Sequence, residues 1–154
     1  MESVKYMTAA EAVRLIRSGD SVYVQGSTSI PEVLVRAMTE RAPELRGVKV
    51  YSAFAVGRED APYARRELID SFEAVSFFVA NNLRRAIREG VAQTIPAFLG
   101  EIPSLFRNGR VPLDVCLLNV SEPDDEGYCS FGISADLAVS AVECSKIVIA
   151  QVNR

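Results

Sequence analysis

Five apolar runs of strand length recur along the chain. They are rich in valine, isoleucine and aromatic residues, and several are continuous rather than alternating with polar residues. Continuous apolar runs are typical of parallel strands whose sheet is covered on both faces. The runs occupy residues 21–25, 48–53, 75–80, 114–121 and 146–152.

Segments with helical periodicity lie between these runs. In the first of them Thr8 precedes Glu11 by three residues, which is the pattern of a capping box. Pro31 stands where a second helix begins, and Asn81 and Asn82 are candidate caps of another. The expected helices cover residues 8–19, 31–42, 62–72, 82–90, 101–108 and 134–145. The alternation of strands and helices predicts an α/β fold, with an open, mostly parallel sheet and helices on both faces.

Composition and charge narrow the possible functions. The 154 residues are 49% hydrophobic, which suits a single domain over residues 1–154 with a real core. The 17 basic and 20 acidic residues are interspersed, so no basic face is available for a nucleic acid. No run approaches the roughly 20 apolar residues of a membrane span, and the start lacks an export signal. We therefore expect a cytoplasmic protein with neither a membrane nor a nucleic acid as partner.

The reactive residue types are few. Three cysteines, Cys116, Cys129 and Cys144, form no CxxC pair, and we expect core or near-core thiols rather than a metal site or a disulfide framework. The chain contains no histidine, so it cannot build a Ser-His-Asp triad, a Cys-His dyad or a histidine-ligated zinc site by itself. Its chemistry has to use carboxylates, hydroxyl groups, lysine or backbone dipoles.

Four loops follow the predicted strands at their carboxyl ends: "GSTSIP", "AFAVG", "NNL" and "SEPDDEGYCSFG". In an open α/β sheet such loops share one edge, where ligands bind. The first loop combines Gly26, the three hydroxyl residues 27–29 and Pro31, and its N–H groups together with the helix dipole suit a carboxylate or phosphate. An equally good interpretation is a glycine turn followed by a Ser29 cap. The loop matches neither a Walker motif nor a GxGxxG fingerprint.

The fourth loop places four carboxylates within five residues, 122–126. Two carboxylates about 4 Å apart repel by about 1 kcal/mol even in water, so most of them must face solvent. We interpret "PDDEG" as a turn in which Asp side chains bond their own backbone and Gly127 relieves strain. The pocket wall is then Ser121 before the turn and the segment 128–132 after it.

These residues, in this order, resemble the amino-terminal domain of the acetyl-CoA hydrolase/transferase family, which includes 4-hydroxybutyrate, butyrate:acetate and succinate CoA-transferases. The run resembling S-x-P-D-x-x-G-Y-x-S-x-G is the most specific part of the match. The similar stretches are "GDSVYVQGSTSIPEVLVRAM", "FFVANNLRRAIREGVAQTIPAFLGEIPSLF", "DVCLLNVSEPDDEGYCSFGISAD" and "KIVIAQVN".

The resemblance implies a CoA-transferase-like (NagB/RpiA-type) fold and an enzyme with two α/β domains and a cleft between them. In such enzymes a glutamate attacks an acyl-CoA thioester, and a glutamyl-CoA intermediate passes CoA to a second carboxylate. That glutamate belongs to the second domain, so this chain would hold no catalytic residue, and neither Glu101 nor Glu126 is expected to be the nucleophile. The resemblance assigns the pocket to Gly26, Ser27, Thr28, Ser29, Ser52, Asn81, Ser121, Ser130 and Gly132.

The same resemblance implies no permanently bound cofactor, with a coenzyme A thioester as substrate. The expected partners are acyl-CoA, a short carboxylate of the acetate, butyrate or 4-hydroxybutyrate type, and a carboxy-terminal catalytic domain. Residues 146–154 look like a central strand, which predicts a longer polypeptide and, for this chain alone, an apolar patch that favours a homo-oligomer. A non-catalytic carboxylate- or CoA-binding module and an acetyl-CoA hydrolase are the alternatives.

Overall fold

A computed structural model describes residues 5–53 and 60–153 and places their strands in one six-stranded sheet. The order is β4-β3-β2-β1-β5-β6, and every neighbouring pair is parallel, as the apolar runs predict. The strands are β1 (Ser21–Val24), β2 (Val48–Ser52), β3 (Phe72–Ser76), β4 (Ala92–Thr94), β5 (Leu113–Ser121) and β6 (Ser145–Asn153).

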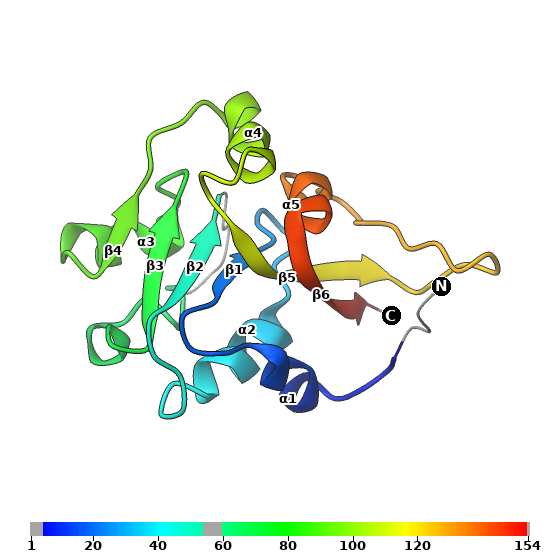
Figure 1. Ribbon diagram of the computed structural model, residues 1–154, viewed down its shortest axis with the longest axis horizontal. Helices are drawn as coiled ribbons and strands as arrows, with labels where there is room; N and C mark the ends of the chain where they lie inside the picture. Colours follow the sequence, from blue (N-terminus) through cyan, green and yellow to red (C-terminus); the bar gives the residue numbers. More distant parts are fainter. Residues whose placement is uncertain (1–4, 54–59, 154) are drawn as a thin grey trace.

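Helices cover the sheet on both faces, which confirms the predicted fold class (Figure 1). α1, α2 and α3 contribute to one core layer, and α4 and α5 contribute to the other. The α-helices are α1 (Ala9–Ala12), α2 (Glu32–Glu40), α3 (Asn81–Arg88), α4 (Ile102–Arg107) and α5 (Ala138–Cys144). Short 3₁₀ turns are η1 (Val13–Leu15), η2 (Arg66–Leu68) and η3 (Leu99–Glu101). All helices of the described residues are too short to cross a membrane.

The two core layers follow from the alternation of side chains along each strand. Val22 and Val24 of β1 belong to the layer of α1, α2 and α3, whereas Tyr23 between them belongs to the layer of α4 and α5. The Tyr23 ring meets Phe106 of α4 edge to face, with 5.8 Å between ring centroids. Phe106 also meets Phe77 at 5.7 Å. Because both faces of β1 are buried, its sequence reads as a continuous apolar run.

The first helix begins as predicted but ends early. Thr8 is its N-cap, and the Glu11 side chain accepts the Thr8 N–H at 2.9 Å, which completes the capping box. These hydrogen bonds lower the pKa of Glu11. After Ala12 the chain tightens into η1, and Ile16 leaves the helix with extended backbone.

Two predictions between residues 62 and 80 are wrong, and one strand was missed. The expected helix 62–72 is reduced to η2, because successive three-residue turns, such as Leu68 N–H to the Arg65 carbonyl, bring Phe72 into the sheet. β3 therefore starts earlier than expected, and it ends where the Ser76 hydroxyl bonds the Phe78 carbonyl at 2.5 Å. β4 was not predicted, since only one of its three residues is buried.

Residues 146–152, expected as a central strand of a longer polypeptide, form β6 in the described part of the chain. There β6 lies at the edge of the sheet and pairs with β5 alone. Its side chains alternate, with Ile149 6% exposed and Val148 45% exposed. On the face of Val148, Val152 packs against the layer of α4 and α5, so that face is covered only in part.

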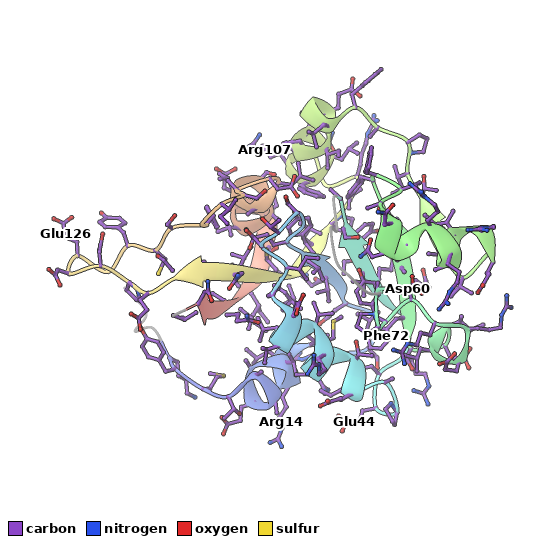
Figure 2. All side chains as sticks on the ribbon, turned by 180° about the vertical axis from the view of Figure 1, so that it is seen from behind. Arg14, Glu44, Asp60, Phe72, Arg107 and Glu126 are labelled. Atoms are coloured by element: carbon purple, nitrogen blue, oxygen red, sulfur yellow. The ribbon has the colours of Figure 1, made fainter. Side chains whose placement is uncertain are left out.

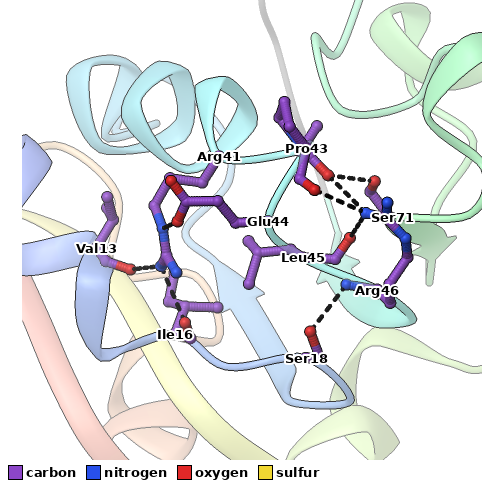
Figure 3. Close-up of polar contacts among 10 residues, drawn as sticks. Val13, Ile16, Ser18, Arg41, Pro43, Glu44, Leu45, Arg46 and Ser71 are labelled. Atoms are coloured by element: carbon purple, nitrogen blue, oxygen red, sulfur yellow. Dashed lines mark hydrogen bonds and ion pairs between the residues drawn. The ribbon is translucent and has the colours of Figure 1, made fainter.

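Two arginines donate hydrogen bonds to backbone carbonyls near the amino edge of the sheet, where the strands begin (Figure 3). Arg41, after α2, donates to the carbonyls of Val13 and Ile16, the latter at 2.9 Å. Arg46, before β2, donates to the carbonyls of Ala42, Pro43 and Leu45. These guanidinium groups add hydrogen bonds to carbonyls in the turns that follow η1 and α2. The Val13 and Ala42 carbonyls also accept from the Ile16 N–H and the Ser71 hydroxyl.

Candidate functional site

The strands β1, β2, β3 and β5 end at the same edge of the sheet, because all of them are parallel. This carboxyl edge holds the loop 26–29, Ser52, Asn81 and Ser121, as the sequence predicts. Most of the predicted loop "AFAVG", residues 54–57, lies outside the described residues. The shared edge brings segments together that lie about 100 residues apart in the chain.

The glycine loop after β1 is compact. Gly26 is buried, Ser27 has a positive φ of 56°, and the Ser29 N–H donates to the Gly26 carbonyl at 3.2 Å. Ser29 is 5% exposed, whereas Thr28 points to solvent. A non-glycine residue in the left-handed region is uncommon and occurs where the surrounding structure holds it in place.

The helix that follows this loop is already partly capped. Pro31, rather than Ser29, occupies the N-cap position of α2, so the alternative of a Ser29 cap is wrong. The Val33 N–H donates to Oε1 of Gln151 on β6 at 3.0 Å. An anion at this helix terminus would therefore have to bind beside an amide oxygen that occupies one of the first-turn donors.

Two buried polar side chains lie near the carboxyl ends of β2 and β3. Ser52, 1% exposed at the end of β2, has the Tyr63 hydroxyl as the partner of its Oγ. Oδ1 of Asn82, in the first turn of α3 and in a residue 7% exposed, has no hydrogen-bond partner among the described residues. Asn81, the predicted site residue, is exposed, and neither asparagine caps the helix, because Ala80 is the N-cap. Unpaired buried polar atoms are costly and are often found where a ligand or water binds.

A buried phenol lies close to Ser52. Tyr63 is 3% exposed, and burial raises its pKa to about 12, with the Ser52 hydroxyl opposing the shift. The phenol is therefore neutral at physiological pH. It supplies a hydroxyl group, not a negative charge, next to the end of β2.

The fourth loop forms a protruding hairpin, residues 121–134, which we call the arm (Figure 1). Ser121 and Ser130 pair at its root, since the Ser121 N–H donates to the Ser130 carbonyl and the Ser130 N–H donates to Oγ of Ser121, both at 2.9 Å. The Ser130 hydroxyl accepts the N–H of Gly132 at 3.0 Å, and Gly132 has a φ of 73°. The structure thus joins three of the predicted site residues.

The tip of the arm is a turn, as interpreted from its carboxylates. Oδ1 of Asp124 accepts the N–H groups of Glu126 at 3.0 Å and Tyr128 at 2.8 Å, and Gly127 has a φ of 86°. Figure 2 shows Glu126 at the far end of the arm, away from the sheet. All four carboxylates are exposed. They therefore do not line a desolvated pocket.

Several apolar side chains of the arm face solvent. Tyr128 is 71% exposed and Ile133 is 91% exposed. Cys129 is also exposed, so the prediction of a core or near-core thiol is wrong for this residue. It is correct for Cys116, which is buried and whose pKa burial raises to about 12. The arm has an outer surface of apolar groups that the described residues leave uncovered.

A buried polar cluster near the root of the arm has no counterpart among the predicted site residues. Gln25, with no exposed surface, bonds both to β5 and to the end of the arm. Near it, burial raises the pKa of Tyr23 well above its ordinary value, with Asp136 as a further cause. Burial also raises the pKa of Asp136, although Tyr23 and the Leu137 N–H oppose this shift. An amide in an apolar run gives no periodic signal, which is why these residues were not identified.

A separate groove of about 610 Å³ lies between η2 and α3. It contains three arginines, Arg65, Arg66 and Arg85, together with Asp60, Glu67 and Glu89. Arg85 pairs with Asp60 at 2.7 Å, and Arg66 donates to the Glu89 carbonyl at 2.9 Å. Equal numbers of opposite charges leave this groove without a net field for an anion.

Comparisons with known proteins agree with the predicted fold. The family described as "Acetyl-CoA hydrolase/transferase N-terminal domain" matches residues 3–154. The 4-hydroxybutyrate coenzyme A transferase of Clostridium kluyveri is 37% identical over 150 residues, which cover 97% of this chain and 34% of that protein. A succinyl-CoA:acetate/propanoyl-CoA:succinate CoA transferase of Fasciola hepatica is 34% identical over 145 residues, covering 93% of this chain and 30% of its own length.

A solved structure extends the same comparison. The crystal structure of a 4-hydroxybutyrate CoA-transferase from Porphyromonas gingivalis superposes with a TM-score of 0.77 at 30% identity. The superposition covers 96% of this chain and 33% of that one. The present chain thus spans about a third of the length of the relatives it matches.

Proposed function

Because the chain belongs to the acetyl-CoA hydrolase/transferase family, we propose that it forms the amino-terminal part of a two-domain CoA-transferase. The reaction moves coenzyme A between an acyl-CoA and a short carboxylate of the acetate, butyrate or 4-hydroxybutyrate type. The match over residues 3–154, shared with relatives named as CoA transferases, is the observation that supports this proposal.

In the proposed reaction a glutamate carboxylate attacks the thioester carbonyl carbon and expels CoA as a thiolate, which gives an acyl-glutamyl anhydride. The thiolate then attacks the glutamyl carbonyl and releases the first carboxylate, leaving a glutamyl-CoA thioester. A second carboxylate repeats these steps in reverse and leaves as the new acyl-CoA. The chemistry needs no histidine, in agreement with a chain that contains none.

The nucleophilic glutamate belongs, in this proposal, to a second domain, so the present chain is inactive alone. Its own contribution is one wall of the acyl and carboxylate pocket at the carboxyl edge of the sheet. Ser52 fits this role because its buried hydroxyl lies at the end of β2. A hydroxyl has one donor and two acceptor positions, so its contact with Tyr63 leaves capacity for a ligand oxygen. Ser29, also buried, lies in the loop at the end of the neighbouring strand.

The reaction is tested by following label from [¹³C]acetate into acetyl-CoA with butyryl-CoA as donor. We expect exchange from the protein with a second domain and none from residues 1–154. Release of free CoA thiol without an acceptor would instead identify a hydrolase. Saturable binding of CoA or acetate by this chain, in a protein that never catalyses exchange, would contradict the proposal and support a binding module.

A pair of serine variants tests the pocket. Ser52→Ala removes a hydroxyl whose neighbouring partner is Tyr63, so we expect a higher KM together with a loss of at most about 1 kcal/mol in the free energy of unfolding. Ser71→Ala removes the bond from Oγ of Ser71 to the Ala42 carbonyl at the opposite edge, 2.7 Å long. This control should lower stability by about 1 kcal/mol and leave KM unchanged. Equal effects of Ser52→Ala on KM and stability would make Ser52 a packing residue only.

A further inference from the structure

The side chain of Gln25 connects three segments at the root of the arm. It has no exposed surface. Its Oε1 accepts the N–H of Asn119 on β5 at 2.7 Å, and its Nε2 donates to the Ser134 carbonyl at 2.9 Å. Since a neutral amide has one acceptor and one donor group, Gln25 can make both contacts at once.

The contact with Asn119 extends the pairing of β1 with β5. The last paired residues are Val24 and Leu117, and the Gln25 N–H still donates to the Leu117 carbonyl at 3.0 Å. Beyond this point β1 has ended while β5 continues, so the Asn119 N–H faces a position that lacks a neighbouring strand. The amide oxygen of Gln25 takes the place of the missing backbone acceptor.

The contact with Ser134 holds the other end of the arm. The arm leaves β5 after Ser121 and returns through Ser134 toward α5. Ser121, the last residue of β5, bonds Ser130 and so joins the two sides of the arm at its root, but this contact does not reach the end of the arm at Ser134. Gln25 bonds the chain just before the arm and again at its end, so it fixes the orientation of the whole hairpin relative to the glycine loop that begins at Gly26.

We infer that Gln25 is a positioning residue, which fixes the arm at the carboxyl end of β5 and so sets the place of Ser130 relative to the ligand. The two hydrogen bonds of Gln25, which we call the tether, form whether or not the protein catalyses a reaction. Their effect on turnover, in contrast, rests on the proposed function.

Two substitutions separate the tether from general packing. Gln25→Met keeps a similar apolar volume and removes both hydrogen bonds. Gln25→Glu keeps both bonds only while the carboxylic acid is protonated, because the neutral group has an O–H donor and a carbonyl acceptor. Once ionised, it cannot donate to the Ser134 carbonyl, and burial makes the charge costly. The titratable groups of the same cluster are Tyr23 and Asp136, and both are present in the unsubstituted chain.

The primary measurement is amide hydrogen exchange in peptides covering residues 117–136, relative to the unsubstituted chain at the same pH. Gln25→Met should exchange roughly tenfold faster or more at every pH, the size expected for two lost hydrogen bonds. Gln25→Glu should match the unsubstituted chain at low pH and approach Gln25→Met as the pH rises. The matched controls Gln93→Met and Gln93→Glu, at an exposed position of β4 on the other edge, should leave these peptides unchanged.

If Gln25→Met leaves amide exchange in the arm unchanged, the tether does not exist. The same conclusion follows if exchange accelerates equally in peptides of β2 and β3, because that result indicates a loss of global stability. In the complete enzyme Gln25→Glu should add a fall in kcat at high pH that the unsubstituted enzyme lacks. If arm exchange changes and kcat does not, the positioning role is wrong although the tether is real. If the unsubstituted enzyme transfers no CoA, the proposed function fails while the exchange data still decide the tether.

Discussion

The carboxylate of Asp114 is the position at which the structure makes its sharpest stability prediction. It lies at the start of β5, where it accepts the Ser21 N–H of β1 at 2.9 Å and the ammonium group of Lys146 on β6 at 2.6 Å. Both contacts lower the pKa of Asp114, with the Lys146 contact the larger cause. One side chain therefore links three adjacent strands at the edge opposite the candidate site.

The two contacts differ in size. Asp114→Ala leaves the Ser21 N–H, in a residue 7% exposed, without an acceptor, which costs about 1–3 kcal/mol. Asp114→Asn keeps an oxygen for that N–H and loses the ion pair, which costs about 0–1 kcal/mol because the Lys146 side chain is 78% exposed. With a urea m-value of about 2 kcal/mol/M, Asp114→Ala should lower the midpoint by roughly 0.5–1.5 M.

The assay is urea unfolding of the unsubstituted chain, Asp114→Ala, Asp114→Asn and Lys146→Met at pH 7 and at a series of acidic pH values. A carboxylate whose pKa is lowered by folding stabilises the protein above its unfolded pKa of about 3.9, and this contribution is lost as the pH falls through the folded pKa. The advantage of Asp114 over Asp114→Asn should therefore disappear in acid. The reasoning is refuted if either Asp114→Asn or Lys146→Met is as unstable as Asp114→Ala at pH 7. Either result would mean that the bond to Ser21 is not the main contribution of Asp114 to stability.

The core and the thiols give two further predictions. Phe106→Ala should lower the free energy of unfolding by about 3–5 kcal/mol, because Phe106 is 3% exposed and packs against Tyr23 and Phe77. In the same urea experiment, Phe106→Leu should lower it clearly less. With a thiol reagent at pH 8, Cys129 should react in the native chain, whereas Cys116 should react only after unfolding, because burial raises the Cys116 pKa to about 12. Fast labelling of Cys116 in the native chain would show that its strand opens.

Sequence periodicity predicted the sheet because most of its strands are buried on both faces. Val22, Tyr23 and Val24, for example, are all buried although their side chains point to alternate faces, so apolar residues follow one another without interruption. Periodicity failed for β4, where Gln93 and Thr94 are exposed, and this strand exists only because β3 offers it a neighbour. Short strands at an edge depend on tertiary contacts, and these leave no local pattern.

Within the candidate site, the turn in the fourth loop could be predicted from the sequence. It follows from the known behaviour of Asp and Gly, and the contacts of Asp124 and the positive φ of Gly127 confirm it. Gln25 could not be found in this way. Its role depends on β1 ending before β5, a difference in strand length that no local sequence feature encodes.

The two edges of the sheet differ in how completely their polar groups are paired. At the amino edge, Arg41, Arg46 and Asp114 bond backbone groups that the strands and helices leave open. Among the described residues, Oδ1 of Asn82 and Oδ1 of Asn119 are buried without a hydrogen-bond partner, and both lie toward the carboxyl edge. An unpaired buried polar group destabilises a fold unless a ligand or water bonds it. The paired groups of the amino edge therefore stabilise the fold, whereas the carboxyl edge keeps polar atoms that a ligand can bond. A ligand that satisfied these atoms should therefore raise the unfolding temperature of the chain even in the absence of any reaction.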